Sequence, residues 1–272
     1  MYSCVRAVQN GQLDLMGFVD YAAAQGVGGV ELLDIFWTDA EREIPKVKQR
    51  IADAGLKLAV YSIGNNFIQP DAKARQQELA DLRRGVDIAR ELGVDIVRVF
   101  SGSERAGVSQ EQGMVWILEG LLAGAAYAEA RGVTLALENH GRFAGRSDQV
   151  RGIIEQVNSS ALRVNLDTGN FLPVGQNPVE AAEDLADLAS LVHLKDMRLA
   201  QGDEASHVFT APDGQMLTGS VIGDGLVDLA AIRVVMDGAG YAGWWSLEYE
   251  GAEEPLAVGV PQSLAAARKL LA

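Results

Sequence analysis

Acidic and imidazole side chains lie at the ends of several short apolar runs in the second half of the chain. Glu138 closes VTLALE, Asp167 closes LRVNLD, His193 lies in LVHLKD and Glu248 lies in WWSLEYEG. If these runs are parallel strands of one barrel, their carboxyl ends meet at the same mouth, so residues distant in sequence converge there. Three carboxylates and one imidazole would then form a site for a divalent metal ion.

The residue types in this set limit the metal. Oxygen-rich sites with one imidazole suit Mn²⁺, Mg²⁺ or Co²⁺, whereas structural zinc sites prefer thiolates and several histidines. Cys4 is the only cysteine, so neither a thiolate cluster nor an intrachain disulfide can form. Taken singly, a strand-end carboxylate can cap a helix and His193 can be a core histidine, so the prediction rests on the combination. We expect one divalent ion, with Mn²⁺ as first choice and Mg²⁺, Co²⁺ or Zn²⁺ as the others.

The elements that must position these residues follow a repeating pattern. Short apolar runs alternate with amphipathic stretches such as DLMGFVDYAAAQ and AEREIPKVKQRIADA, an order typical of βαβ units. Several of these stretches end in a glycine, such as Gly55 and Gly93, where a helix favours a left-handed residue. We predict eight strands, near residues 3–8, 29–33, 57–62, 96–100, 134–138, 163–167, 191–194 and 245–249. This count predicts an α/β fold, a single (β/α)₈ TIM barrel spanning residues 1–272.

The composition limits the partners. The formal net charge of −14 disfavours nucleic acid, which calls for a clustered basic face. No apolar run reaches the roughly 20 residues that span a bilayer, and the first residues lack a signal-peptide pattern, so we expect no membrane partner and a cytoplasmic location. A small neutral molecule is the expected ligand, and the sequence leaves homo-oligomerisation open.

Other features surround the predicted mouth. Residues 198–228 form the longest connection and are rich in turn residues, so we expect a lid over the mouth. Arg98 and Lys195 are cations near strand ends, although Lys195 can equally serve as an ion-pair partner. Trp37 follows a strand end and could form an apolar wall against a sugar ring, or belong to the local core. The P-loop, HExxH and G-x-S-x-G motifs are absent, which argues against an NTPase and a serine hydrolase.

With these motifs in place, the chain resembles the xylose isomerase-like superfamily of sugar isomerases, epimerases and dehydratases. The segments that carry the resemblance are LALENHG, NLDTGNF, HLKD, GDG at 223–225 and SLEYEG. The resemblance covers essentially the whole chain. It implies one ion held by Glu138, Asp167, His193 and Glu248, with the two glutamates also placed on opposite sides of the substrate as acid and base.

The resemblance also suggests residues around the substrate. It places Glu31 of GVELLD near the pocket and His140 in the E-N-H-G variant of the fifth strand. Tagatose-type epimerases carry a histidine where this chain has Asn170 and an acidic residue where it has Ala144, which argues against that subgroup. The small number of histidines, together with the acidic charge, argues against a role like that of endonuclease IV. The predicted substrate-binding set is Glu31, Trp37, Arg98, His140, Asn170 and Lys195.

Three functions remain open at this point. The first is a metal-dependent isomerase or epimerase of a small keto sugar or ketocyclitol, in which one glutamate removes a proton to give an enediolate and the other returns it. The second is a dehydratase of an inosose-like cyclic hydroxyketone, with His140, His207 or Lys195 as acid for the leaving hydroxyl. The third is a non-catalytic sugar-binding barrel, which the presence of both acid/base glutamates disfavours.

Overall fold

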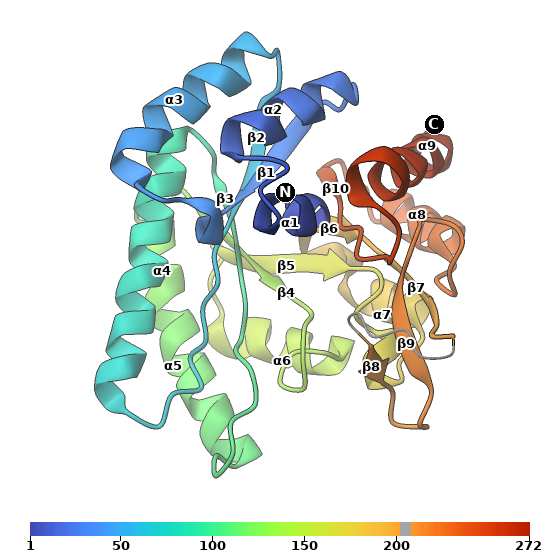
Figure 1. Ribbon diagram of the computed structural model, residues 1–272. Coiled ribbons are helices and arrows are strands. Elements are labelled where there is room, and N and C mark those ends of the chain that lie inside the picture. Colours follow the sequence, from blue (N-terminus) through green and yellow to red (C-terminus); the bar gives the residue numbers. More distant parts are fainter. Residues whose placement is uncertain (202–207) are drawn as a thin grey trace.

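Parallel strands form the centre of the molecule, and helices surround them (Figure 1). The computed structural model describes residues 1–201 and 208–272, and within these ranges seven strands pair in the order β1-β2-β3-β4-β5-β6-β10. All six neighbouring pairs run parallel, as expected when helices connect the strands. The strands are β1 (Gly29–Leu33), β2 (Lys57–Ser62), β3 (Ile96–Val99), β4 (Thr134–Glu138), β5 (Leu162–Asp167), β6 (Ala189–Leu194) and β10 (Trp244–Leu247). This nearly closed barrel confirms the predicted TIM-barrel fold class.

Helices between the strands begin and end where local chemistry favours it. The Asp71 carboxylate accepts hydrogen bonds from the amides of Lys73 and Ala74 at the start of α4, and Gly93 ends that helix with a φ of 82°. The α-helices are α1 (Val5–Gln9), α2 (Leu15–Ala24), α3 (Ala40–Asp53), α4 (Ala72–Leu92), α5 (Gln110–Glu129), α6 (Ser147–Val157), α7 (Pro178–Leu185), α8 (Leu229–Gly238) and α9 (Val260–Leu271). Short 3₁₀ turns cover Tyr2–Cys4, Asp34–Phe36, Leu172–Val174 and Ala186–Leu188, and a π turn covers Pro255–Gly259. Among the helices described, none is long and apolar enough to cross a bilayer.

The predicted strand at residues 3–8 is wrong, because this segment is helical. The 3₁₀ turn Tyr2–Cys4 leads directly into α1. Cys4 and Ala7 are its buried apolar side chains, and their spacing of three residues fits a helix; a short apolar run alone does not distinguish helix from strand. The barrel sheet therefore has seven strands in the described chain, where the sequence predicted eight.

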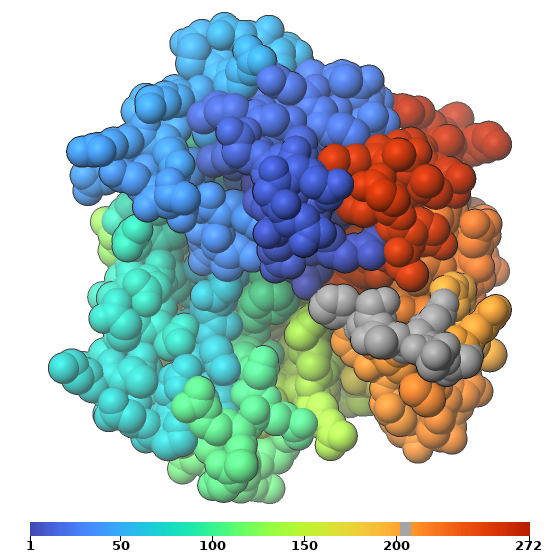
Figure 2. Space-filling model, viewed as in Figure 1, coloured from blue at the N-terminus to red at the C-terminus, as the bar shows by residue number. Residues whose placement is uncertain are grey.

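The missing strand pairing leaves a gap, here called the seam, between the edge strands β1 and β10. In the described residues β1 pairs only with β2, and β10 only with β6. The N-terminal residues lie against this gap: the Ser3 hydroxyl donates to the Leu247 carbonyl at 2.7 Å, and the Arg6 guanidinium donates to the Gly251 carbonyl at 2.7 Å. Figure 2 shows the resulting contact between the N-terminal and C-terminal segments on one face of the molecule.

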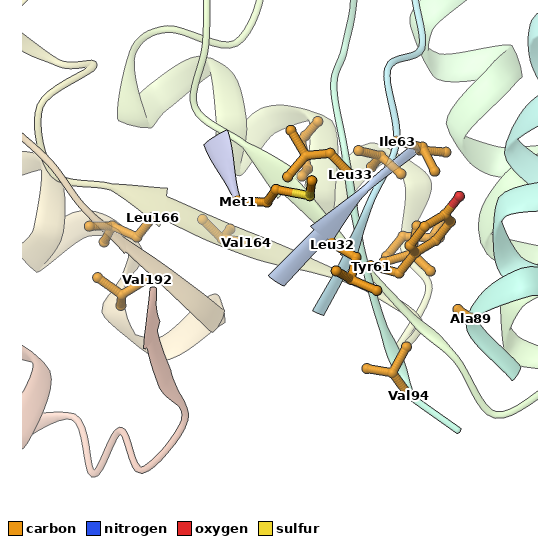
Figure 3. Close-up of a cluster of buried hydrophobic side chains, with 14 of the residues drawn as sticks. Met1, Leu32, Leu33, Tyr61, Ile63, Ala89, Val94, Val164, Leu166 and Val192 are labelled. Carbon is orange, nitrogen blue, oxygen red and sulfur yellow. The ribbon is translucent and has the colours of Figure 1, made fainter. Parts of the chain in front are cut away.

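Apolar side chains fill both the helical layer and the lower part of the barrel. Figure 3 shows buried residues such as Leu32 of β1 and Tyr61 of β2 in the main core. A smaller cluster contains Ala136 of β4 and Leu191 of β6, with Trp244 packed against it. Because side chains two residues apart on a strand share a face, this cluster lies one layer below Glu138 of β4 and His193 of β6. It gives the mouth an apolar floor.

The described parts of the long connection 198–228, together with the two residues before it, form a small antiparallel sheet beside the barrel. Strands β7 (Asp196–Leu199), β9 (Met216–Ser220) and β8 (Phe209–Thr210) pair in that order. Gly219 of β9 lies against Glu250, where an added Cβ atom would be 2.6 Å from the Glu250 backbone. The described part of this connection therefore packs beside the mouth.

Candidate metal centre

The four predicted metal ligands converge at the carboxyl ends of their strands. Glu138 ends β4, Asp167 ends β5, His193 is the penultimate residue of β6 and Glu248 directly follows β10. Asp167 pairs opposite His193, and the Glu248 amide donates to the Leu194 carbonyl at 3.0 Å. One ligand atom from each of the four lies within 4.8 Å of all the others, and all four residues are buried. This group could hold a metal ion.

Asp167 contributes an oxygen that lacks a donor. Its Oδ1 accepts hydrogen bonds from the amides of Gly169 at 2.8 Å and Asn170 at 2.9 Å. Its Oδ2 is buried without a hydrogen-bond partner in the described chain. Burial raises the pKa of Asp167 well above its ordinary value. Lys195, whose Nζ lies 3.9 Å from Oδ2, opposes this rise, and the carboxylates Glu248 and Glu138 add to it. A buried acceptor without a donor is costly, and a cation at this point would satisfy it.

His193 lies between carboxylates on both sides of its ring. Nε2 is 3.1 Å from Oε2 of Glu31, while Nδ1 is 2.5 Å from Oε2 of Glu248 and 3.5 Å from Oε2 of Glu138. Burial alone would lower the pKa of His193, but Glu31 and Glu248 raise it well above its ordinary value. Without a metal, the imidazolium supplies the positive charge that these carboxylates require. A metal ligated by Nδ1 would displace that proton.

Lys195 and Glu250 form the side of the cluster nearest β9. Lys195 Nζ lies 3.3 Å from Oε1 of Glu248 and 3.1 Å from Oε1 of Glu250. Burial alone would lower the pKa of Lys195, but Glu250 and Asp167 raise it well above its ordinary value. Burial raises the pKa of Glu250 to about 6. Glu250 was not among the predicted site residues, although its position two residues after Glu248 was a usable signal.

Polar side chains hold the Glu138 carboxylate in place. Arg98 Nε lies 3.4 Å from Oε2, Asn165 donates to Oε2 at 3.1 Å, and Asn170 donates to Oε1 at 3.2 Å. Arg98 also donates from Nη1 to the Ile63 carbonyl at 3.0 Å. Arg98 and Asn170 were both predicted to bind substrate, and in the structure they contact the carboxylate of Glu138, which is a predicted metal ligand. Asn165 was not predicted, since an amide inside a strand carries no distinctive sequence signal.

A cavity of about 180 Å³, here called the mouth cavity, opens above the cluster. Both Glu138 and Glu248 line it, together with Arg98, His140, Phe100 and Glu250. The His140 ring packs against Phe100 with the ring centroids 5.0 Å apart, and burial lowers the pKa of His140. His140 is therefore neutral at physiological pH.

Several predicted features do not line the mouth cavity. Asn170 and Lys195 are outside its lining and instead contact Glu138 and Glu248. Trp37 lines a different cavity, of about 310 Å³, where its Nε1 donates to the Tyr61 hydroxyl at 2.8 Å. Glu31 lines a cavity of about 440 Å³ at the seam. Within the part of residues 198–228 that the structure describes, no side chain lines the mouth cavity, so the expected lid over it is not seen there. His207 lies outside the described residues.

Comparison with known proteins gives a consistent family. A family model described as "Xylose isomerase-like TIM barrel" matches residues 19–270. A solved L-ribulose 3-epimerase is similar in structure, with a TM-score of 0.77 at 20% identity, over 94% of this chain and 88% of that one. At this identity the likeness shows the fold.

Curated relatives include an epimerase and dehydratases. The 2-epi-5-epi-valiolone 7-phosphate 2-epimerase of an Actinoplanes species is 35% identical over 184 residues, which are 64% of this chain and 65% of that protein. An inosose dehydratase of Geobacillus kaustophilus is 25% identical over 81% of this chain and 75% of its own length. A 3-dehydroshikimate dehydratase of Pseudomonas putida is 27% identical over 83% of this chain, which spans 34% of that longer protein.

Proposed function

Since the chain belongs to the xylose isomerase-like TIM barrel family, we propose that it is a divalent-metal-dependent isomerase or epimerase of a small keto sugar or ketocyclitol. One observation carries the proposal. Glu138 and Glu248 belong to the candidate metal cluster and also line the mouth cavity, so both carboxylates can reach a ligand held there. The same two side chains can therefore orient a substrate and exchange protons with it.

The donor set fits a hard or borderline dication. Glu138, Asp167, His193 and Glu248 would hold it, and the Asp167 oxygen without a donor supports this fit. When bound, the ion would supply Lewis-acid chemistry by polarising the substrate carbonyl and its neighbouring hydroxyl. Mn²⁺ is the first expectation for this set.

The proton transfers fall to the two glutamates. Burial alone would raise the pKa of Glu248, but Lys195 and His193 lower it well below its ordinary value, so Glu248 is ionised at neutral pH. It can therefore start as the base that removes a proton from the carbon next to the carbonyl. Glu138, entering the cycle with a proton taken from solvent, then delivers it to the neighbouring carbon in an isomerase, or to the opposite face of the same carbon in an epimerase. Proton exchange with solvent returns both glutamates to their starting states.

Charged and apolar neighbours support the enediolate. Arg98 and Lys195 place positive charge beside Glu138 and Glu248, and a cation fixed in a buried site stabilises a developing oxyanion. The mouth cavity of about 180 Å³ suits a small molecule. Because carboxylates predominate around it, the reacting end of the substrate is expected to be neutral.

The dehydratase relatives support a second candidate, dehydration of an inosose-like cyclic hydroxyketone. The same enolate would expel a β-hydroxyl group instead of being reprotonated at carbon. This outcome needs an acid beside the leaving oxygen. His140 lines the mouth cavity, but because burial lowers its pKa it would have to take up a proton before it could act as that acid.

One experiment separates these functions. We would incubate the protein with Mn²⁺ and a panel of ketopentoses, ketohexoses and inososes in D₂O, and follow the reaction by proton NMR. An isomerase or epimerase replaces a substrate proton with deuterium and gives an isomer, whereas a dehydratase also loses water. A pure binder shows sugar affinity without exchange.

A variant tests the role of Glu248. Loss of a general base typically costs about 10²–10⁴-fold in rate, so Glu248→Gln should reduce deuterium incorporation by that factor when metal loading is verified. Glu119→Gln, an exposed change on α5, is the matched control and should exchange normally. Equal incorporation in the Glu248 variant and the wild type would remove Glu248 from the acid/base role.

A further inference from the structure

The Glu31 carboxylate lies below the mouth, between β1 and the strands on the far side of the seam. Its Oε2 is 3.1 Å from Nε2 of His193 on β6 and accepts a hydrogen bond of 2.6 Å from Ser246 on β10. Its Oε1 accepts a hydrogen bond from Ser62 on β2. These contacts join strands across a gap that, in the described residues, no β1–β10 backbone pairing closes.

The position of Glu31 argues against direct contact with the substrate. The residue is only 7% exposed, and it lines the cavity at the seam instead of the mouth cavity. Its two oxygens are already engaged by two serine hydroxyls and one imidazole nitrogen. Glu31 therefore acts on the mouth through His193.

The hydrogen-bond pattern selects one form of the His193 ring. A carboxylate that accepts from two hydroxyls also accepts from the third group, so Nε2 of His193 carries a proton and donates to Glu31. In the metal-free protein Nδ1 carries the second proton of the imidazolium and faces Glu248 and Glu138, at 2.5 and 3.5 Å. A metal at this position would replace the Nδ1 proton, while the Nε2 proton stays with Glu31. A ligating histidine needs this arrangement, because the second nitrogen usually donates to a carboxylate that fixes the tautomer and ring orientation.

We propose that Glu31 is a positioning residue that holds His193 in its Nε2–H tautomer and directs Nδ1 at the metal position from across the seam. This inference rests on the proposed metal-dependent function. It assigns Glu31 a role in metal affinity and replaces the substrate contact expected from the sequence.

The first test uses the unmodified protein. Zn²⁺ serves as a diamagnetic probe, and ¹⁵N-histidine labelling with long-range ¹H–¹⁵N correlation reports the state of both His193 nitrogens. Assignment comes from comparison with His140→Gln and His207→Gln proteins. We expect a protonated Nε2 and a metal-shifted Nδ1. A metal-shifted Nε2 would overturn the proposal. This measurement is made on the wild-type protein, so it does not depend on whether a Glu31 variant folds.

The second test compares two substitutions by calorimetric titration with Mn²⁺. Loss of an outer-shell partner typically weakens metal binding by about 10–100-fold, and Glu31→Gln should do so while mixing the two tautomers of His193. Ser246→Ala is the matched control, because it removes one hydrogen bond across the seam but leaves the Glu31–His193 contact. For this variant we expect a Kd for Mn²⁺ within about threefold of the wild type and the same His193 tautomer.

Three outcomes have distinct meanings. If Glu31 only joins the edges of the seam, both variants will weaken binding alike, and the positioning role is wrong. If Glu31→Gln binds Mn²⁺ as the wild type does and keeps the same tautomer, the role is also wrong. If the wild-type protein binds neither Mn²⁺ nor Zn²⁺, the metal-dependent function fails together with the role of Glu31 in metal affinity.

Discussion

Asp167→Asn should remove the metal without disturbing the metal-free fold. The asparagine oxygen can still accept from the amides of Gly169 and Asn170, as Asp167 Oδ1 does. Burial raises the pKa of Asp167, so a neutral side chain costs less free energy at this position than at an exposed one. We therefore expect the metal-free variant to unfold within about 1 kcal/mol of the wild type, a difference of about 2–4 °C in Tm.

The metal response should differ sharply between the two proteins. A ligand present at 100 times its Kd stabilises the wild type by about 2.7 kcal/mol, which raises Tm by about 5–10 °C. If the substitution weakens binding 100-fold, the same Mn²⁺ concentration gives RT ln 2, about 0.4 kcal/mol, and a shift of about 1 °C. The variant replaces a charged ligand with a weaker amide, so this loss is the minimum expected.

Differential scanning calorimetry with Mn²⁺ and with EDTA measures both quantities. Asp95→Asn is the matched control, since Asp95 is exposed just before β3 at the end of the barrel opposite the mouth. It should keep the full metal shift. A Tm increase in Asp167→Asn equal to that of the wild type would mean that the ion binds elsewhere. A large loss of stability without metal would mean that the carboxylate serves the fold itself.

Two further predictions concern protons and the loop beside the mouth. The pKa of His193 in the metal-free protein is raised, so protons compete with metal throughout the pH range below that pKa. Mn²⁺ affinity should therefore rise with pH until His193 deprotonates, by up to about tenfold per unit, and proton release in calorimetric titrations checks this. Gly225→Ala should destabilise the protein by about 2 kcal/mol or more, because the added Cβ atom would lie 2.0 Å from Oδ1 of Asp196, which accepts a hydrogen bond from the Val227 amide. Chemical denaturation measures the change in the free energy of unfolding. An unchanged free energy would show that the loop rearranges to accommodate the methyl group.

The sequence was most informative where function depends on residue type and local period. Short apolar runs predicted β1 and β4 at the residues where the structure has them. The carboxyl ends of parallel strands share one edge, so Glu138 and Asp167 could be placed together before any contact was known. The same residues allowed us to predict the class of metal ion, because three carboxylates and one imidazole limit which ions such a site would bind, whatever their exact geometry.

Other parts of the site could not be read from local patterns. Glu31 was placed near the pocket by resemblance, but its contact with His193 joins residues 162 positions apart and depends on how β1 is oriented across the seam. The link between Lys195 and Glu250 likewise depends on two loops meeting beside β9. Hydrophobic pattern fixes which face of a strand is buried, but it does not specify which distant partner that face meets.

The sequence by itself thus determined an α/β barrel of alternating strands and helices, and it supplied an acidic ligand set at the ends of the strands. Only the tertiary structure decided that residues 3–8 are helical, that Trp37 lines a separate cavity and that Glu31 contacts His193. The physical reason is the range of the interactions. Strand and helix periods are set by near neighbours, whereas hydrogen-bond partners and cavity walls are set by chain segments that meet only after folding.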